Sequence, residues 1–550
     1  MNTHPQSRHT PSRRTFLRAA AASTLGLMAA NRVEAAPVYD LVIKGAMLVD
    51  GTGGPARVSD IGITGDTIVA LGTVDPAHGR EVLNAAGLHV CPGFVDIHSH
   101  SDRYIFATPG ADSRARQGIT TEVTGNCGSS AAPQLEGNWK SVASYAALIG
   151  EAGVAVNQAL LLGQGTLRFN AVQMVDRPLT QEELARVLDA VETGMNEGAF
   201  GLSTGLEYTP GRYTPTDEIV AMAKVVARHG GLYASHIRNE EAGLIDAVRE
   251  CLDIGGQARV RTQVSHIKAA GRPNWGKQDE VLRMIEAARA EGIDVMGDAY
   301  PYTAYSTSLG IFLPDCALEG GEAEARKRLQ DPAQRSRIRE YVGPRVASDP
   351  GGFELIVLAT SPGDDLAWTV GVDVAAIAAR WAVEPVDALL RLIEESGGAS
   401  LFVGHAMDPA NVDRVLAHPL VMIGSDGAAM APPEPGNTAP TQPHPRSYGT
   451  CPRVLGHYVR ERKLFDLPTA IRKMTSMPAE RLGLTDRGRI AEEMKADLVM
   501  FDPATVAETS TFDAPHQYPI GIPHVIVNGT FVVRDGTSTG ARPGKMLRRG

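Results

Sequence analysis

Short apolar stretches alternate with amphipathic helical periods through the middle of this 550-residue chain. A strand followed by a helix is the repeating unit of a parallel sheet, and eight such units close into a (β/α)8 barrel, also called a TIM barrel. The clearest helical periods cover residues 181–197, 216–229, 278–291 and 374–395. Ten candidate strands compete for the eight places of the barrel, and the sequence leaves open which two lie outside it. They end near His98, Thr124, Leu162, Ser203, His236, His266, Asp298, Leu358, Val403 and Ser425.

Strand-like segments also occupy both ends of the chain. Residues 39–43 alternate polar and apolar side chains, and residues 525–533 are rich in β-branched residues. We therefore predict a small β-sandwich formed by both chain ends, from residues 36–91 and 485–550. Two unrelated β-extensions are the alternative.

The barrel itself is expected over residues 92–484. Within this range, residues 317–347 are charged and helix-prone, which is more typical of an insertion than of a barrel element. An insertion that could serve as a lid is therefore predicted near residues 305–350.

The N-terminal segment carries the three parts of an export signal. Arg13 and Arg14 precede a mildly apolar stretch at residues 19–30, and residues 33–35 form a small-x-small cleavage pattern. The whole resembles a twin-arginine signal peptide over residues 1–35, whose alternative is a disordered basic tail. It predicts a periplasmic protein that is exported, already folded, by the twin-arginine machinery.

Charge and composition exclude several classes of partner. The net charge of −10 gives no basis for nucleic-acid binding. No apolar run in the mature sequence approaches the roughly 20 residues of a membrane span. The five cysteines show no paired spacing, so a disulfide framework is not expected. Four of them are predicted to be buried apolar residues, whereas Cys127 has a different setting.

Histidines follow several of the candidate strands. His98 and His100 are spaced one residue apart, which on a strand points both imidazoles to the same side. His236 and His266 end two later strands. Because the carboxyl ends of barrel strands meet at one rim, these four side chains are expected to converge on a metal ion. Structural histidines and a metal-free, histidine-lined pocket are the alternatives.

Two further residues complete the candidate site. Cys127 lies in a Gly-Asn-Cys-Gly turn directly after a candidate strand, and a thiolate beside imidazoles favours zinc over magnesium or calcium. A nucleophilic thiol is the competing interpretation, which is less favoured because a metal-bound thiolate is a poor attacking group. Asp426 follows the last candidate strand, where a carboxylate could take a proton from metal-bound water and pass it to a leaving amine. It could also serve as a helix N-cap.

From residue 38 to residue 535 the chain resembles the amidohydrolase superfamily, and within it the D-aminoacylase (N-acyl-D-amino-acid deacylase) family. The His-x-His pair alone marks only the superfamily, whereas the Cys127 turn and the segments around Tyr208 and Arg446 are more specific. The segments that carry the resemblance are 92–100, 118–121, 125–128, 200–208, 265–268, 424–427, 444–446 and 495–502.

This resemblance implies a distorted TIM barrel of the amidohydrolase type and a metal site with two positions. Cys127, His236 and His266 would hold one zinc ion tightly. His98, His100 and Asp426 would form a weaker second position. Asp426 would also be the general acid and base.

Related hydantoinase-like and dihydroorotase-like enzymes bridge two metals with a carboxylated lysine after the fourth strand. Residues 200–204 here read Phe-Gly-Leu-Ser-Thr and contain no lysine. Cys127 would therefore take the bridging role, and the difference argues against ring opening of cyclic amides.

The resemblance also implies residues that hold the substrate. Lys268 and Arg446 would bind its carboxylate, and Tyr208 and Tyr302 would donate hydroxyl groups, although each cation could instead be an ordinary surface residue. Family members that prefer acidic side chains carry an arginine soon after the Tyr-Pro-Tyr segment. Residues 311–315 here read Ile-Phe-Leu-Pro-Asp, which favours neutral or apolar substrate side chains.

The activity implied is hydrolysis of a small N-acyl-D-amino acid to a carboxylate and a free D-amino acid. A metal-bound hydroxide would attack the amide carbonyl while Asp426 moves the proton. The preference for the D isomer comes from the resemblance alone. Two alternatives stay open, namely a dipeptidase acting on D-containing or isopeptide bonds, and an inactive amidohydrolase-like binding protein.

Overall fold

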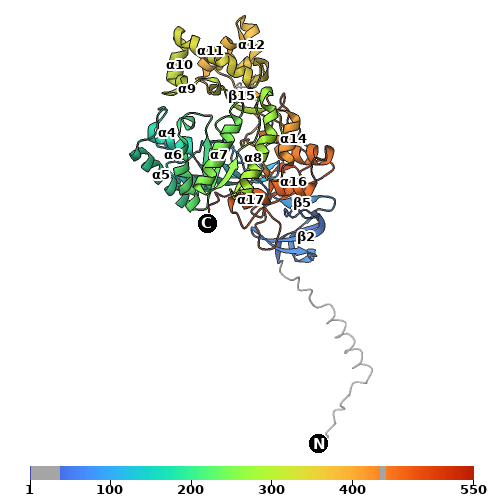
Figure 1. The fold of residues 1–550 in the computed structure, drawn as a ribbon. Coiled ribbons are helices and arrows are strands. Elements are labelled where there is room, and N and C mark those ends of the chain that lie inside the picture. The colour runs from blue at the N-terminus through green and yellow to red at the C-terminus, as the bar shows by residue number, and fades with distance from the viewer. Residues whose placement is uncertain (2–37, 434–440, 550) are drawn as a thin grey trace.

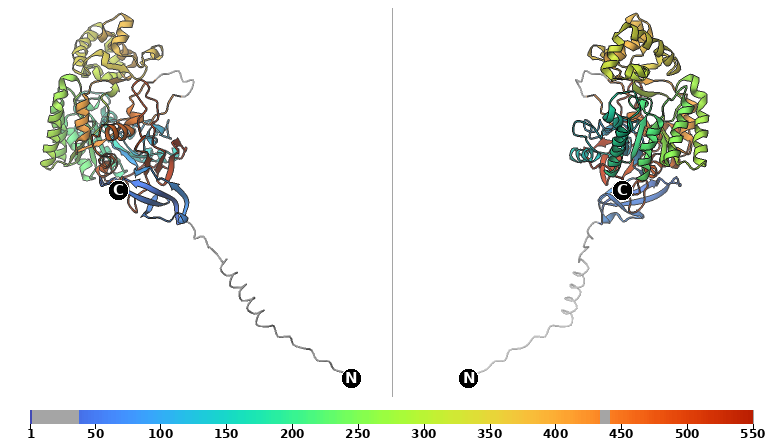
Figure 2. Two further views of the ribbon diagram at one scale, coloured as in Figure 1. Left: turned by 90° about the vertical axis from the view of Figure 1, so that its right-hand side faces the viewer. Right: turned by 60° about the vertical axis from the view of Figure 1, so that its left-hand side comes forward.

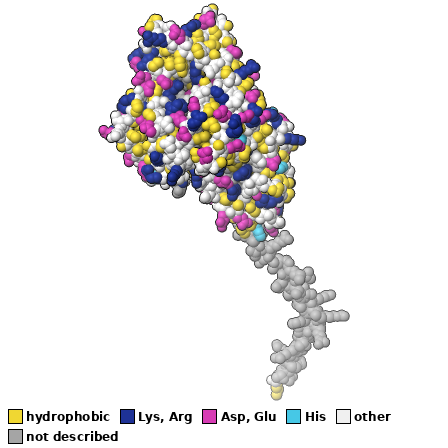
Figure 3. Space-filling view, in the orientation of Figure 1, with side chains coloured by type: hydrophobic (Ala, Val, Ile, Leu, Met, Phe, Trp, Pro, Cys, Tyr) yellow, Lys and Arg dark blue, Asp and Glu magenta, His cyan; other side chains and the backbone are white. Residues whose placement is uncertain are grey.

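The computed structural model describes Met1, residues 38–433 and residues 441–549. Apart from Met1, the predicted export signal lies outside these residues. None of the helices in the described part of the chain has the length and apolar character needed to cross a membrane. On the face shown in Figure 3, acidic and basic side chains are interspersed.

Eight parallel strands form the central sheet, and each pairs with the next along the chain. The sheet is nearly closed, because a single bridge between Ser99 and Gly427 joins its first and last strands. The strands are β6 (Phe94–Asp96), β7 (Ile119–Thr124), β8 (Asn157–Gly163), β9 (Gly201–Gly205), β10 (Leu232–His236), β11 (Arg261–Val264), β12 (Val295–Ala299) and β16 (Val421–Ile423). This is the predicted (β/α)8 barrel.

Helices surround this sheet and bury their apolar faces against it (Figure 1). Three of the predicted helical periods are found almost to the residue, as α5 (Gln181–Asn196), α6 (Thr216–Arg228) and α8 (Gln278–Ala290). The others around the barrel are α2 (Asp112–Ala115), α3 (Val142–Ala152), α4 (Gln164–Val172), α7 (Leu244–Ala258), α14 (Pro409–Ala417), α15 (Arg446–Arg453), α16 (Leu467–Met474) and α17 (Ser476–Leu482).

The two candidate strands outside the barrel are those ending near Leu358 and Val403. They are β14 (Ile356–Leu358) and β15 (Leu401–Gly404), which join β13 (Tyr305–Ser308) in a separate antiparallel sheet. Five helices complete this unit: α9 (Asp315–Leu318), α10 (Glu322–Gln330), α11 (Pro332–Ser348), α12 (Val374–Trp381) and α13 (Pro385–Ser396).

We call residues 305–404 the insertion. It lies over the carboxyl ends of the barrel strands, at the top of Figure 1 and Figure 2, and has its own buried core around Phe312, Leu389 and Phe402. The insertion extends beyond the predicted 305–350. The prediction was too short because the apolar strands β14 and β15 resemble barrel strands in sequence. The helical period at 374–395 is also divided into two helices, since Pro385 begins a new helix rather than continuing the first.

Segments from both ends of the chain form a single sheet of nine strands, which lies on the side of the barrel away from the insertion (Figure 1). Strand β5 pairs with β17, and this contact joins the N-terminal and C-terminal parts around one core. The alternative of two unrelated extensions is therefore wrong. The strands are β1 (Tyr39–Leu48), β2 (Arg57–Thr64), β3 (Thr67–Gly72), β4 (Gly79–Asn84), β5 (His89–Pro92), β17 (Leu498–Phe501), β18 (His524–Val527), β19 (Thr530–Arg534) and β20 (Thr537–Ser538).

The last described residues run across the amino ends of the barrel strands. Gly544 bridges Val154, and the backbone amide of Leu547 donates to the carbonyl of Gln158 at 2.8 Å. The Leu547 side chain packs against the apolar cluster inside this end of the barrel. This tail, residues 544–549, therefore covers the end of the barrel opposite the insertion.

A buried arginine ties the strand ends below the candidate site together. Arg114 is fully buried, contacts the carboxylate of Asp96, and donates to Glu122 Oε1 at 2.8 Å and to Ser425 Oγ at 2.7 Å. Its three partners follow or lie in β6, β7 and β16, so one guanidinium links three strands. Removing one partner of a buried ion pair leaves the others charged and unpaired.

We therefore expect Arg114→Leu to lower the free energy of unfolding by about 3–5 kcal/mol. The measurement is the shift of the urea unfolding curve. Arg186→Leu is the matched control, because Arg186 lies on α5 with a side chain that is 56% exposed. Equal shifts for the two variants would contradict the role given to Arg114.

Candidate metal centre and cavity

All six predicted ligand residues lie together at the carboxyl rim of the barrel. They stand at the ends of five different strands, and their convergence is produced by the closure of the sheet. They are His98 and His100 after β6, Cys127 after β7, His236 at the end of β10, His266 after β11 and Asp426 after β16.

Cys127, His236 and His266 form the first cluster. One donor atom from each lies within 4.8 Å of the donors of the other two. The Cys127 Sγ is 3.5 Å from His266 Nε2, and His236 Nδ1 is 2.8 Å from the same nitrogen. Three donors at this separation suit one metal ion.

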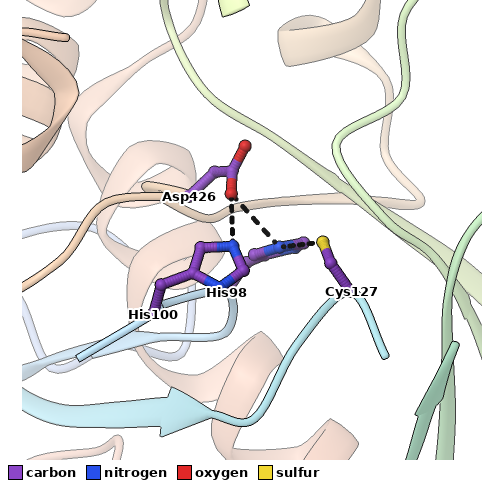
Figure 4. Close-up of side chains that lie close together, drawn as sticks. All are labelled: His98, His100, Cys127 and Asp426. Atoms are coloured by element: carbon purple, nitrogen blue, oxygen red, sulfur yellow. Dashed lines mark hydrogen bonds and ion pairs between the residues drawn. The ribbon is translucent and has the colours of Figure 1, made fainter. Parts of the chain in front are cut away.

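The second cluster adds His98, His100 and Asp426 (Figure 4). Asp426 Oδ1 lies 2.8 Å from His100 Nε2 and 3.4 Å from His98 Nε2. The Cys127 Sγ is 3.3 Å from His98 Nε2, so the thiol belongs to both clusters. It stands where a ligand shared between two metal positions would be required.

The backbone is unusual at three of these residues. Cys127, His266 and Asp426 have φ angles of 50°, 33° and 53°. Residues other than glycine rarely adopt this left-handed region of the backbone. Each such residue costs about 1–3 kcal/mol and is typical of functional sites. Gly128 follows Cys127 for a related reason, because a Cβ there would lie 2.5 Å from the backbone nitrogen of Gly205.

Three carboxylates orient the imidazoles, and none was predicted from the sequence. They face the ring nitrogens that point away from the centre: Asp298 lies 3.2 Å from His98 Nδ1, Glu207 lies 3.3 Å from His236 Nε2, and Glu240 lies 3.0 Å from His266 Nδ1. A carboxylate in this place holds the ring proton and leaves the inner nitrogen free to bind a metal. The arrangement is that of histidines prepared as ligands.

The protonation states also fit a metal. Burial disfavours the thiolate of Cys127, but the adjacent His98 and His266 outweigh it and hold the pKa of the thiol well below its usual range. Burial likewise opposes ionisation of Asp426, but Arg446 and His98 hold the pKa of that carboxyl well below its usual range. A donor set of one thiolate, several imidazoles and one carboxylate matches zinc.

A cavity opens beside the two clusters. His236, His266 and Asp426 lie in its wall, together with Lys268 and Tyr208. The insertion supplies the remaining side of the cavity. The residues of the insertion that line the cavity are Tyr305, Ser306, Thr307, Ile311 and Asp349.

The predicted substrate-binding cations both have partners within the protein. Lys268 lines the cavity, with its Nζ 2.6 Å from Glu240 Oε1 and 2.8 Å from His266 Nδ1. Arg446 lies 2.7 Å from Asp426 Oδ2 and also donates to the Ser306 carbonyl at 3.2 Å. Both are buried, so neither is an ordinary surface residue.

The two predicted tyrosines differ in position. Tyr208 lines the cavity, and its hydroxyl accepts a hydrogen bond from Thr307 at 3.1 Å. Tyr302 does not line the cavity, because its hydroxyl donates to Glu508 Oε2 at 2.9 Å. Tyr300 takes the place in the wall instead. Strand β12 ends at Ala299, so the alternation of a strand no longer predicts which side chain faces the site.

Residues 81–311 and 372–533 match the amidohydrolase family, and the segment between them falls within the insertion. The D-aminoacylase of Alcaligenes xylosoxydans xylosoxydans is 36% identical, over 93% of this chain and 98% of its own length. The N-acyl-D-glutamate deacylase of the same organism is 38% identical, over 93% and 96%. The N-acyl-D-aspartate deacylase is also 38% identical, over 93% and 95%.

Solved structures agree with these similarities. A crystal structure of N-acyl-D-glutamate deacylase from Bordetella bronchiseptica, bound to zinc and a phosphonate inhibitor, has a TM-score of 0.79 and 34% identity, and covers 93% of this chain and 100% of that one. A D-aminoacylase with a binuclear metal centre has the same TM-score, identity and coverage. The dihydropyrimidinase of Brevibacillus agri, at 17% identity and a TM-score of 0.55, shares the fold alone.

Proposed function

Because this chain belongs to the amidohydrolase family, and within it to the D-aminoacylases, we propose that it hydrolyses N-acyl-D-amino acids to a carboxylate and a free D-amino acid. The observation that carries the proposal is the Cys127 thiol, which lies between His98 and His266 and is shared by both clusters. No lysine follows the fourth barrel strand, so the thiol provides the shared donor. The relatives with zinc and with a binuclear centre support the same assignment.

The donor sets indicate which residues would hold the metal. Cys127, His236 and His266 would bind one zinc ion tightly, and His98, His100 and Asp426 would form a weaker second position. Zinc bound there supplies Lewis-acid activation of water and of the amide carbonyl. The remaining steps of the reaction belong to the side chains of the chain itself.

Asp426 is the residue that moves the proton. It lines the cavity, and Arg446 keeps its carboxylate ionised, which is the form a general base requires. It takes a proton from the attacking water and delivers it to the nitrogen of the leaving amine. Cleavage of the C–N bond then releases the amino acid in its free form.

Lys268 and Tyr208 bind and orient the substrate. The ammonium of Lys268 lies in the cavity wall beside His266, and we assign it to the α-carboxylate of the amino acid. Tyr208 provides a hydroxyl on the same wall. Residues 311–315 contain no arginine of the kind expected for acidic side chains, which argues against D-glutamate and D-aspartate derivatives.

The proposal is tested with a panel of N-acetyl and N-formyl derivatives of D- and L-amino acids, together with dipeptides, scored for released amine. We expect turnover of D derivatives at least 100-fold faster than of their L isomers, with about one zinc ion retained after purification. Turnover of L derivatives alone would contradict the stereochemical assignment. Turnover of dipeptides alone would identify a peptidase, and a zinc-free protein without activity would indicate a binding protein.

A further inference from the structure

The wall that the insertion contributes to the cavity carries a carboxylate with one oxygen that has no partner among the described residues. Asp349 directly follows helix α11, lines the cavity and is only 3% exposed. Its Oδ2 accepts a hydrogen bond from the Tyr305 hydroxyl at 2.7 Å. Its Oδ1 has no hydrogen-bond partner among the described residues. A buried carboxylate oxygen without a donor is costly, so an occupant that supplies one is expected.

The charges around Asp349 leave this side of the cavity negative. Glu207 and Glu241 also line it, and both contact Arg345, at 2.7 Å and 2.6 Å. Burial raises the pKa of Glu241 well above its usual range, so the Arg345 guanidinium faces two ionised carboxylates, Glu207 and Asp349. Arg345 is occupied by its two glutamates and is not among the residues that line the cavity, so it offers nothing to an anionic ligand.

The lysine that lines the cavity, Lys268, does not change this balance. Lys268 is paired with Glu240 at 2.6 Å, beside the metal clusters rather than beside Asp349. An N-acyl amino acid with its amide at the clusters and its α-carboxylate at Lys268 would direct its side chain toward the insertion. The group at the end of that side chain would meet Asp349.

We propose that the cavity selects N-acyl-D-amino acids whose side chain ends in a cation, such as D-lysine or D-arginine, through an ion pair with Asp349. The inference rests on the deacylase function proposed above and replaces the expectation of neutral or apolar side chains. Burial raises the pKa of Asp349 to about 6, which still leaves the carboxylate mostly ionised at neutral pH. The relatives named for D-glutamate and D-aspartate would need the opposite charge at this place.

The test compares four substrates of similar length on the wild-type enzyme: N-acetyl-D-lysine, N-acetyl-D-norleucine, N-acetyl-D-glutamine and N-acetyl-D-glutamate. Norleucine has the methylene chain of lysine without the ammonium. We expect kcat/KM for the lysine derivative to exceed that of each of the others at least ~30-fold, because norleucine and glutamate offer Asp349 no donor and glutamine offers only a neutral one.

Asp349→Asn should reduce the preference for lysine over norleucine at least ~10-fold. Asp387→Asn is the matched control, since Asp387 lies on α13 of the same insertion and pairs with Arg339 on its outer surface. The wild-type comparison decides the inference even if Asp349→Asn does not fold.

The outcomes separate the two proposals. If norleucine, glutamine or glutamate is hydrolysed as well as lysine, the selectivity for a cation is wrong while the deacylase function stands. If none of the four, nor any other N-acyl-D-amino acid, is hydrolysed by the zinc-loaded enzyme, the proposed function itself fails.

Discussion

Asp426→Asn is expected to lower kcat by about 10²–10⁴-fold while the zinc bound by Cys127, His236 and His266 is retained. Asparagine has nearly the shape of aspartate, and it preserves the left-handed backbone at this position better than most residues. It cannot, however, accept a proton from water at neutral pH. The loss should therefore fall on the chemical step rather than on the fold or on the tight metal site.

Steady-state kinetics and metal analysis of the purified variant measure the two parts of this prediction. Asp413→Asn serves as the control, because Asp413 lies on the outer helix α14 and pairs there with the side chain of Arg462. A kcat within about threefold of the wild type would contradict the role of Asp426 in proton transfer. Full rescue by added zinc would instead show that Asp426 acts by holding the second metal.

Cys127→Ala is expected to remove most of the bound zinc and to lower turnover more than 100-fold. Losing a residue that only orients a ligand commonly costs 10–100-fold in metal affinity or activity, and losing the ligand itself should cost more. The effect should be large here because the Cys127 Sγ lies between His98 and His266 and serves both clusters.

Metal content by mass spectrometry, measured beside activity, checks this result. Cys251→Ala is the control, since Cys251 is also a free cysteine but is buried on α7, away from the clusters. If Cys127→Ala kept its full zinc content yet lost turnover, the thiol would be a nucleophile rather than a ligand. That was the competing interpretation of the Gly-Asn-Cys-Gly turn.

The metal residues could be predicted because each carries its own local signal. A strand ends just before the His98–His100 pair, the Cys127 turn and Asp426, and the rim of a barrel brings such ends together. Local sequence is sufficient for that step. The left-handed backbone at Cys127 and Asp426 is also consistent with their neighbouring glycines, Gly128 and Gly427.

The carboxylates that orient the histidines could not be predicted in the same way. Asp298 is 200 positions from His98, and nothing in either segment indicates the partner. Glu207 and Glu240 lie just after strands β9 and β10, in loops with no fixed periodicity. Such pairings depend on the three-dimensional arrangement of loops. The sequence pattern alone does not specify it.

The insertion shows a second limit of sequence reasoning. Strands β14 and β15 are short and apolar, and a short apolar run looks the same in a barrel as in a small antiparallel sheet. Only the pairing of β15 with β13 and β14 distinguishes them. The same limit affected Tyr302, whose direction depends on a turn rather than on a strand.

The tail across the amino ends of the barrel strands has a consequence for the order in which the protein can assemble on the ribosome. Strand β5 pairs early with β1, but its other partner, β17, follows some 400 positions later, as at Val90 and Met500. The contacts of Val154 and Gln158 wait longer still, for Gly544 and Leu547. Neither the terminal sheet nor the floor of the barrel can therefore be completed during synthesis until almost the whole polypeptide has been translated.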